Sequence, residues 1–137
     1  MYYLFIYPLS CVSSIGYGIA LRLALEGASV VALIDRNQEE LDDAASQLEK
    51  ELKDILGEEA DSSMPTFYGL ACDVTDNVRV AETFRHVATK LSPNNRIDIL
   101  VQAAGVVGKT NLLTHEVSPD DFDFVMNVNV KGIFNCW

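Results

Sequence analysis

Residues 13–35 read SSIGYGIALRLALEGASVVALID, and the order of features in this stretch decides the fold. A turn containing Gly16 is followed by an apolar helix pattern, a break at Gly27, a hydrophobic run and a single carboxylate, Asp35. In dinucleotide-binding units, a helix N-terminus faces the pyrophosphate and an acid about 20 residues later binds a ribose. The spacing from Gly16 to Asp35 therefore predicts a nucleotide-binding α/β fold.

The rest of the chain alternates between strand and helix patterns. After a first strand, we expect strands over 29–34, 65–72 and 97–103, and helices over 17–26, 38–56, 76–91 and from 119 onward. Gly27 is expected to end the first helix in a left-handed conformation, Thr75 to cap the third, and Ser118 to cap the fourth. This alternation predicts a Rossmann-like doubly wound parallel sheet with strand order 3-2-1-4 and flanking helices on both faces.

Two of these helices have predicted apolar faces. The first face consists of Leu41, Ala45, Leu48, Leu52 and Ile55, and the second of Val78, Ala81, Phe84, Ala88 and Leu91. The opposite face of the helix over 38–56 holds many of the 20 acidic residues, which outnumber the 10 basic ones and give a net charge of -10. We interpret this acidic face as solvated.

Composition excludes several partners. The negative charge opposes broad contact with the phosphate backbone of nucleic acid. No apolar run approaches the roughly 18 residues of a membrane span. Cys11, Cys72 and Cys136 are odd in number and widely spaced, which predicts no metal site and a reducing compartment, either the cytoplasm or another such as the mitochondrion. We therefore expect one soluble domain without nucleic-acid or membrane partners, in which Cys72 is a buried filler rather than a nucleophile.

The first eight residues, MYYLFIYP, fit a first strand, the apolar core of a signal peptide, or a segment unrelated to the fold. A signal peptide begins with basic residues, whereas the first basic residue here is Arg22. A buried first strand is therefore favoured.

Four segments narrow the function further: SSIG at 13–16, CDVTD at 72–76, DILVQAAG at 98–105 and VNVKGIF at 128–134. In order and spacing they resemble the short-chain dehydrogenase/reductase family, over roughly its N-terminal half. The resemblance implies an NAD(P)-dependent oxidoreductase that moves hydride between nicotinamide and a secondary alcohol or ketone, such as a 3-oxoacyl or hydroxysteroid substrate. It also implies a homo-oligomeric full-length form.

The resemblance assigns roles to twelve residues. The cofactor-binding candidates are Ser13, Ser14, Ile15, Gly16, Asp35, Arg36, Asp73, Val74, Ala103, Ala104 and Gly105, and the catalytic candidate is Asn129. By this resemblance, Ile15 and Gly16 lie against the pyrophosphate and Asp35 binds the adenosine ribose. Asp73 and Val74 border the adenine, residues 103–105 line the nicotinamide-side ribose, and Asn129 is the active-site asparagine.

Without the resemblance, Asp35, Asp73 and Asn129 also fit purely structural roles. Asp35 also fits a solvated turn, and Asp73 a helix-capping turn. Asn129 lies within a predicted helix, where periodicity alone favours a structural asparagine and the resemblance favours the active site. A carboxylate at position 35 favours NAD over NADP because it repels a 2′-phosphate, although Arg36 offers partial compensation.

The N-terminal segment departs from the family pattern. The family turn T-G-x-x-x-G-x-G aligns with residues 9–16, where the last glycine alone is kept and Ser10 replaces the first. We therefore expect residues 1–12 to be an atypical segment, a degenerate first strand and phosphate turn, and residues 13–137 to be the N-terminal part of one NAD(P)-binding domain. A misplaced start or exon would explain this, and sequencing the transcript's 5′ end tests it.

The catalytic pair of the family is missing from this sequence. Family members use a Ser and a Tyr-x-x-x-Lys pair, in which the lysine lowers the tyrosine pKa for proton transfer. No tyrosine here has a lysine four residues later. The chain thus reads as a fragment that is inactive alone, and the alternative is a truncated non-catalytic nucleotide-binding remnant or interaction module.

Overall fold

The computed structural model describes residues 2–7, 15–57, 64–92 and 94–137. Its four strands are β1 (Tyr2–Tyr7), β2 (Ala28–Asp35), β3 (Thr66–Ala71) and β4 (Ile99–Gln102). They form one sheet in the order β3-β2-β1-β4, and every neighbouring pair is parallel. The predicted fold class, strand order and first strand are therefore confirmed.

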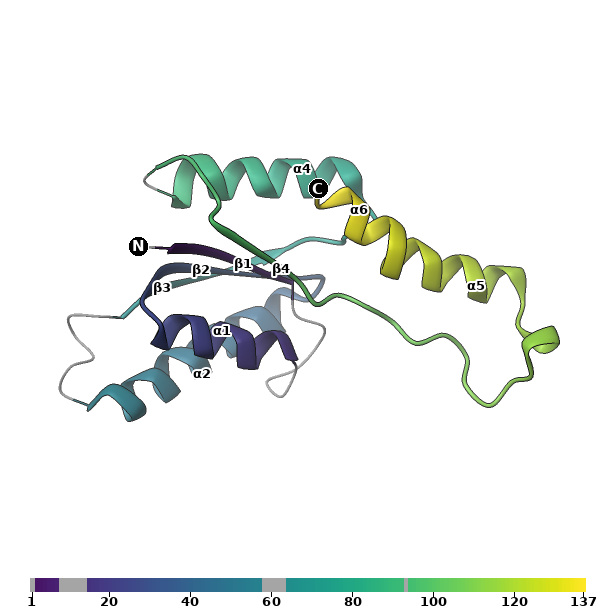
Figure 1. Cartoon of the computed structure of the whole chain (residues 1–137), viewed down its shortest axis with the longest axis horizontal. Helices are drawn as coiled ribbons and strands as arrows, with labels where there is room; N and C mark the ends of the chain where they lie inside the picture. The colour runs from purple at the N-terminus through teal and green to yellow at the C-terminus, as the bar shows by residue number, and fades with distance from the viewer. Residues whose placement is uncertain (1, 8–14, 58–63, 93) are drawn as a thin grey trace.

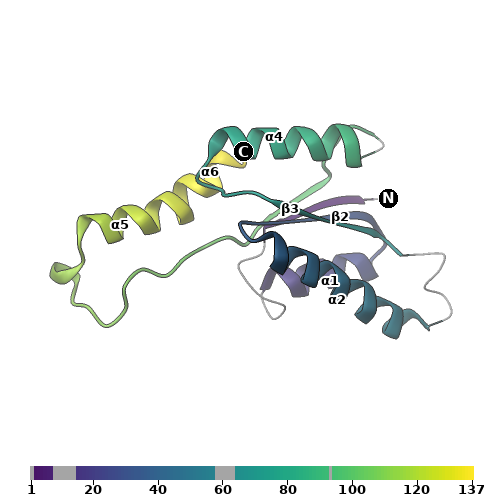
Figure 2. The ribbon, with the colours of Figure 1, turned by 180° about the vertical axis from the view of Figure 1, so that it is seen from behind.

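Helices cover both faces of this sheet (Figure 1). The helices α1 (Ile15–Leu25) and α2 (Gln38–Leu56) lie on one face, and α4 (Asn77–His86) lies on the other. The view from behind also shows α4 on one side of the sheet and α1 and α2 on the other (Figure 2). Among the described residues, no helix combines the length and the apolar character that a membrane crossing requires.

Strand β2 supplies side chains to both hydrophobic layers. Val31 and Leu33 belong to the cluster that contains Leu48 of α2, whereas Ala32 and Ile34 belong to the cluster on the α4 side. Successive side chains of a strand point to opposite faces, so a strand covered on both sides is apolar throughout. The continuous hydrophobic run before Asp35 therefore reflects the position of β2 between two helical layers.

Two apolar faces differ in part from the sequence prediction. Leu41, Leu48 and Leu52 are buried as expected, but Ile55 at the end of α2 is 57% exposed. In α4 the fully buried side chain is Val80, and Val78 is 61% exposed. Phe84 and Leu91 pack against the core as predicted, whereas Val78 and Ala81 are exposed, so the second prediction is wrong for the first turns of the helix.

The ends of the helices follow from local chemistry. Gly27 has φ 87°, which confirms the left-handed residue expected after α1. The prediction that Thr75 caps α4 is wrong, because Asp76 accepts hydrogen bonds from the amides of Val78 and Arg79 at 3.1 and 3.0 Å. A carboxylate at this position also interacts favourably with the helix dipole.

The C-terminal helical region begins where the sequence predicts and then changes form. Ser118 caps α5 (Pro119–Met126) by accepting a hydrogen bond from the Asp121 amide at 3.2 Å. A π-helical segment over Asn127–Gly132 follows, and a short α6 (Ile133–Asn135) packs near α4. The wider turn places Asn129 in a different helical geometry from the one its sequence position predicts.

Candidate functional site

The predicted cofactor residues come from three strand ends at one edge of the sheet. Asp35 is the last residue of β2, Asp73 lies two residues beyond β3, and residues 103–105 follow β4 directly. Because all strands are parallel, their carboxyl ends meet at this edge, where ligands of open α/β sheets bind. A hydrogen bond of 2.7 Å from the Cys72 amide to the Asp35 carbonyl keeps two of these ends together.

The Asp35 side chain is half-buried and held by the main chain that follows it. Its Oδ1 atom accepts a hydrogen bond from the Arg36 amide at 2.5 Å. The Arg36 side chain is exposed. A carboxylate oriented at a strand end in this way is suited to accepting hydrogen bonds from sugar hydroxyls.

Asp73 borders a cavity of about 310 Å³ beside this edge. The cavity is lined by Arg36, Asp73, Thr75, Phe124, Asn127, Val128 and Lys131. Asp73 Oδ1 accepts hydrogen bonds from the amide and the hydroxyl of Thr75, both at 2.8 Å. The fold thus brings Arg36 and Asp73 to one hollow, with a second cation, Lys131, at its rim.

Val74 lies between the end of β3 and the C-terminal helical region. Its side chain is buried, and its carbonyl accepts a hydrogen bond of 2.8 Å from Asn135 Nδ2. A β-carbon on Gly132 would lie 2.6 Å from Val74 Cγ2, so the helix approaches this strand end very closely. Val74 therefore joins the strand end to the C-terminal helical region.

Asn129 reaches from the π-helical segment to the chain that leaves β4. Its Oδ1 accepts from the Val106 amide at 2.7 Å, and its Nδ2 donates to the Val106 carbonyl at 2.9 Å. Gly105 is adjacent, since a β-carbon there would lie 3.5 Å from Asn129 Oδ1. The amide group binds the main chain as a neighbouring strand would, and it fixes the position of residues 105 and 106.

The start of α1 is described in part. Gly16 is buried in its first turn, and the Ile15 side chain is 80% exposed at the helix N-terminus. Ser13 and Ser14 lie outside the described residues. Tyr17 packs between α1 and α2, where burial, with Glu51 nearby, raises the pKa of its phenol to about 12.

Comparison with known proteins assigns this arrangement to a family. Residues 9–137 match the family described as short chain dehydrogenase. The chain belongs to the short-chain dehydrogenase family. Members of this family are oxidoreductases. The matched residues 9–137 include every predicted site residue.

Three curated family members are about one-third identical to this chain. A 3-oxoacyl-acyl-carrier-protein reductase of Thermotoga maritima is 32% identical over 123 residues, which are 90% of this chain and 43% of that protein. An NADPH-dependent pterin aldehyde reductase of Arabidopsis thaliana is 33% identical over 121 residues, 88% of this chain and 43% of that protein. A 2-dehydro-3-deoxy-L-rhamnonate dehydrogenase (NAD(+)) of a Sphingomonas species is 32% identical over 124 residues, 90% and 41% respectively.

A solved structure shows the same fold. The short chain dehydrogenase from Mycobacterium smegmatis superposes with a TM-score of 0.76 at 24% identity, covering 98% of this chain and 48% of that one. The chain thus spans less than half the length of each of these four proteins.

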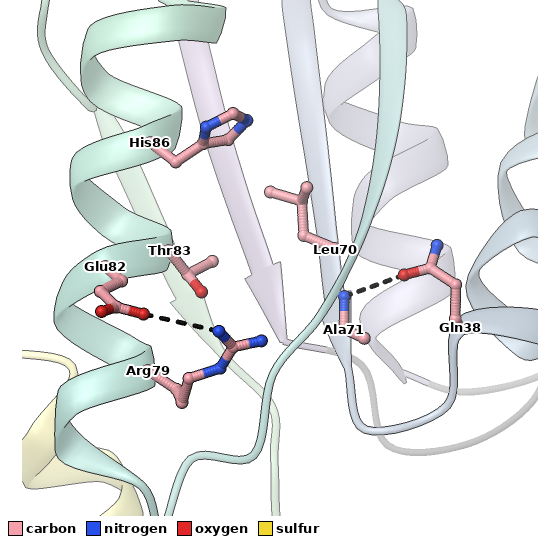
Figure 3. A pocket seen from close by; sticks show the side chains of 7 residues that line it. All are labelled: Gln38, Leu70, Ala71, Arg79, Glu82, Thr83 and His86. Atoms are coloured by element: carbon pink, nitrogen blue, oxygen red, sulfur yellow. Dashed lines mark hydrogen bonds and ion pairs between the residues drawn. The ribbon is translucent and has the colours of Figure 1, made fainter.

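A larger cavity, of about 360 Å³, lies beside the end of β3 (Figure 3). It opens between β3, the start of α2 and one face of α4, and none of the predicted residues that the structure describes lines it. The Gln38 amide occupies one side by bonding the main chain of β3 at the Gly69 carbonyl and the Ala71 amide, at 3.2 and 3.1 Å. Arg79 pairs with Glu82 at 3.5 Å on the other side. The smaller cavity, by contrast, is lined by Arg36 and Asp73, two of the predicted cofactor residues.

Sequence reasoning missed two features of the site. Lys131 joins Arg36 at the smaller cavity, and Asp121 contacts the chain after β4 through the Lys109 amide. A signal for Asp121 exists in the sequence, because Asp121, Val125 and Asn129 are spaced four residues apart and so share a helix face.

Proposed function

We propose that this chain forms the nucleotide-binding half of an NAD-dependent short-chain dehydrogenase that acts on a secondary alcohol or ketone. The observation that carries the proposal is the Asp35 carboxylate at the end of β2, beside the cavity that contains Arg36 and Asp73. These residues fit an adenosine group, because a carboxylate can accept from both ribose hydroxyls and a hollow beside it can take the base.

Each segment has a part in this proposal. Asp35 binds the adenosine ribose, Asp73 and Val74 border the adenine, and the segment ending at Gly16, with Ser13, Ser14 and Ile15, faces the pyrophosphate. Ala103, Ala104 and Gly105 line the ribose next to the nicotinamide, which supplies or accepts hydride when bound. Asn129 is the active-site asparagine and keeps the main chain at Val106 in place.

The choice of NAD gives the first prediction. We expect the chain to bind NADH more tightly than NADPH, because the Asp35 carboxylate repels a 2′-phosphate. Asp35→Ala should lower NADH affinity by about tenfold or more, the size expected for lost hydrogen bonds to a charged group. Fluorescence titration with both nucleotides measures this preference.

Asp43→Ala is the matched control, since it removes one exposed carboxylate from α2 outside the site. Equal affinity of the unaltered chain for the two nucleotides would contradict the choice of NAD. Arg36 and Lys131 at the cavity rim are the groups that would then favour NADP.

A second prediction concerns catalysis. We propose that the chain alone has no dehydrogenase activity, because its sequence has no Tyr-x-x-x-Lys pair to hand a proton to the carbonyl oxygen. The measurement is NADH absorbance at 340 nm with a panel of ketones and alcohols that includes 3-oxoacyl and steroid substrates. Turnover well above the blank would refute the proposal.

The same missing pair supports an alternative, a non-catalytic nucleotide-binding module. Transcript sequence after codon 137 separates the two, because a continuing frame with Ser and Tyr-x-x-x-Lys favours the enzyme. We also propose that the full-length enzyme is a homo-oligomer in a reducing compartment, the cytoplasm or a mitochondrion.

A further inference from the structure

The chain that leaves β4 runs as an extended segment toward the far end of α5 (Figure 1). One helix face, made of Asp121, Val125 and Asn129, lies against it. These three side chains are partly buried, whereas the intervening Phe122, Phe124 and Met126 are exposed. We name residues 105–109 the post-β4 strap.

Buried and exposed residues alternate along the middle of the strap, as they do along a β-strand. Val106 and Gly108 are partly buried against the helix, and Val107 between them is 80% exposed. Alternate residues of an extended chain face opposite sides, which explains why Val107 is exposed between two residues that face the helix. Asn129 contacts Val106, and both Asp121 and Val125 lie against Gly108.

The contacts follow in antiparallel order along the helix. Asn129 holds the near end by its two hydrogen bonds to Val106. Asp121 holds the far end, because its Oδ2 and Oδ1 atoms accept from the Lys109 amide at 3.0 and 3.2 Å. A hydrogen bond to a carboxylate is stronger than one between neutral groups, so the far anchor is a substantial one.

Gly108 lets the strap lie close to the helix between the two anchors. A β-carbon at this position would lie 2.7 Å from Asp121 Oδ2 and 2.9 Å from Val125 Cγ2. Such distances are too short for a non-bonded carbon. The close approach is what brings the Lys109 amide within reach of Asp121.

A segment fixed at one end alone can pivot about that end. With Asn129 as the sole anchor, the main chain beyond Val106 would lose its register on α5, and residues 103–105 would be held by β4 and Asn129 alone. With Asp121 as well, the strap is fixed at both ends, and so is the main-chain surface that it presents. Preorganisation of this kind lowers the ordering cost of ligand binding.

We propose that Asp121 is a positioning residue that locks the post-β4 strap onto α5, so that residues 103–109 are preorganised for the nicotinamide half of the cofactor. The nicotinamide part rests on the proposed function, whereas the lock is a property of the chain without ligand. Asp121 acts through the Lys109 main chain and does not touch the cofactor in this proposal.

The test measures the lock and the ligand separately in the full chain. Amide hydrogen exchange, followed by NMR without nucleotide, should become about tenfold or more faster at Lys109 in Asp121→Ala. Asp121→Asn keeps one acceptor oxygen and should retain most of the protection. Asp123→Ala removes an exposed carboxylate from the same helix and should leave Lys109 unchanged.

The ligand arm compares NADH with ADP-ribose, which lacks the nicotinamide. Asp121→Ala should weaken NADH binding several-fold and leave ADP-ribose binding within twofold. A merely destabilised fold would weaken both ligands together, and that result would overturn the positioning role. Unchanged exchange at Lys109 would overturn the lock itself. If the unaltered chain binds neither ligand, the proposed function and the nicotinamide part fail together, while the exchange result still decides the lock.

Discussion

Gly132→Ala is expected to destabilise the fold by about 1–3 kcal/mol, the usual cost of forcing extra volume into a packed core. The new β-carbon would lie 2.6 Å from Val74 Cγ2 and 3.0 Å from Val74 Cβ. Val74 is buried, and the Asn135 side chain bonds its carbonyl, so it has little freedom to retreat. Urea unfolding followed by circular dichroism measures the loss.

Gly18→Ala is the matched control for this prediction. Gly18 lies in α1, and a β-carbon there would meet no atom within 4 Å. Alanine is the better helix former by about 0.5–1 kcal/mol, so this variant should gain stability. A gain of the same size in both variants would show that the helix does not press on Val74.

Asn129→Ala is expected to cost about 1–3 kcal/mol of stability and to weaken NADH binding by about tenfold or more. The change removes both hydrogen bonds to Val106 and leaves a partly buried amide and carbonyl without that partner. The strap then loses its near anchor beside Gly105. Urea unfolding gives the stability change, and fluorescence titration gives the affinity.

Asn129→Asp separates hydrogen bonding from packing at the same position. It keeps the acceptor for the Val106 amide but places an oxygen opposite the Val106 carbonyl, 2.9 Å from the present nitrogen. Two acceptors repel at that distance, so this nearly isosteric variant should be at least as unstable as Asn129→Ala. An aspartate variant as stable as the unaltered chain would contradict the two-bond geometry. Asp123→Ala, exposed on the same helical run, provides the baseline.

Hydrophobic patterning predicted the sheet and its first two helices well. The helix expected over 38–56 is α2 with those bounds, because Asn37 caps it and Gly57 follows its last turn. The continuous apolar run before Asp35 marked a strand covered on both faces. These features follow from local chemistry, which the sequence records directly.

Prediction failed where two patterns of similar strength competed. Thr75 and Asp76 are both capping residues, but the Thr75 hydroxyl donates to the Asp73 carboxylate and Asp76 caps the helix. In α4 the exposed Val78 and the buried Val80 fit two different helical phases, and the packing on β2 selected one of them. The π-helical turn around Asn129 was not predicted, because the sequence there continues an ordinary helical pattern.

By itself, the sequence determined the alternating α/β fold, the family and the strand-end carboxylates Asp35 and Asp73, because spacing and hydrophobic period are local properties. The tertiary structure alone decided which distant groups meet. It placed Asn129 on Val106 and Asp121 on Lys109, pairs separated by 23 and 12 residues. The physical reason is that such contacts depend on how a helix lies along an extended segment, which close packing fixes only when the chain is folded.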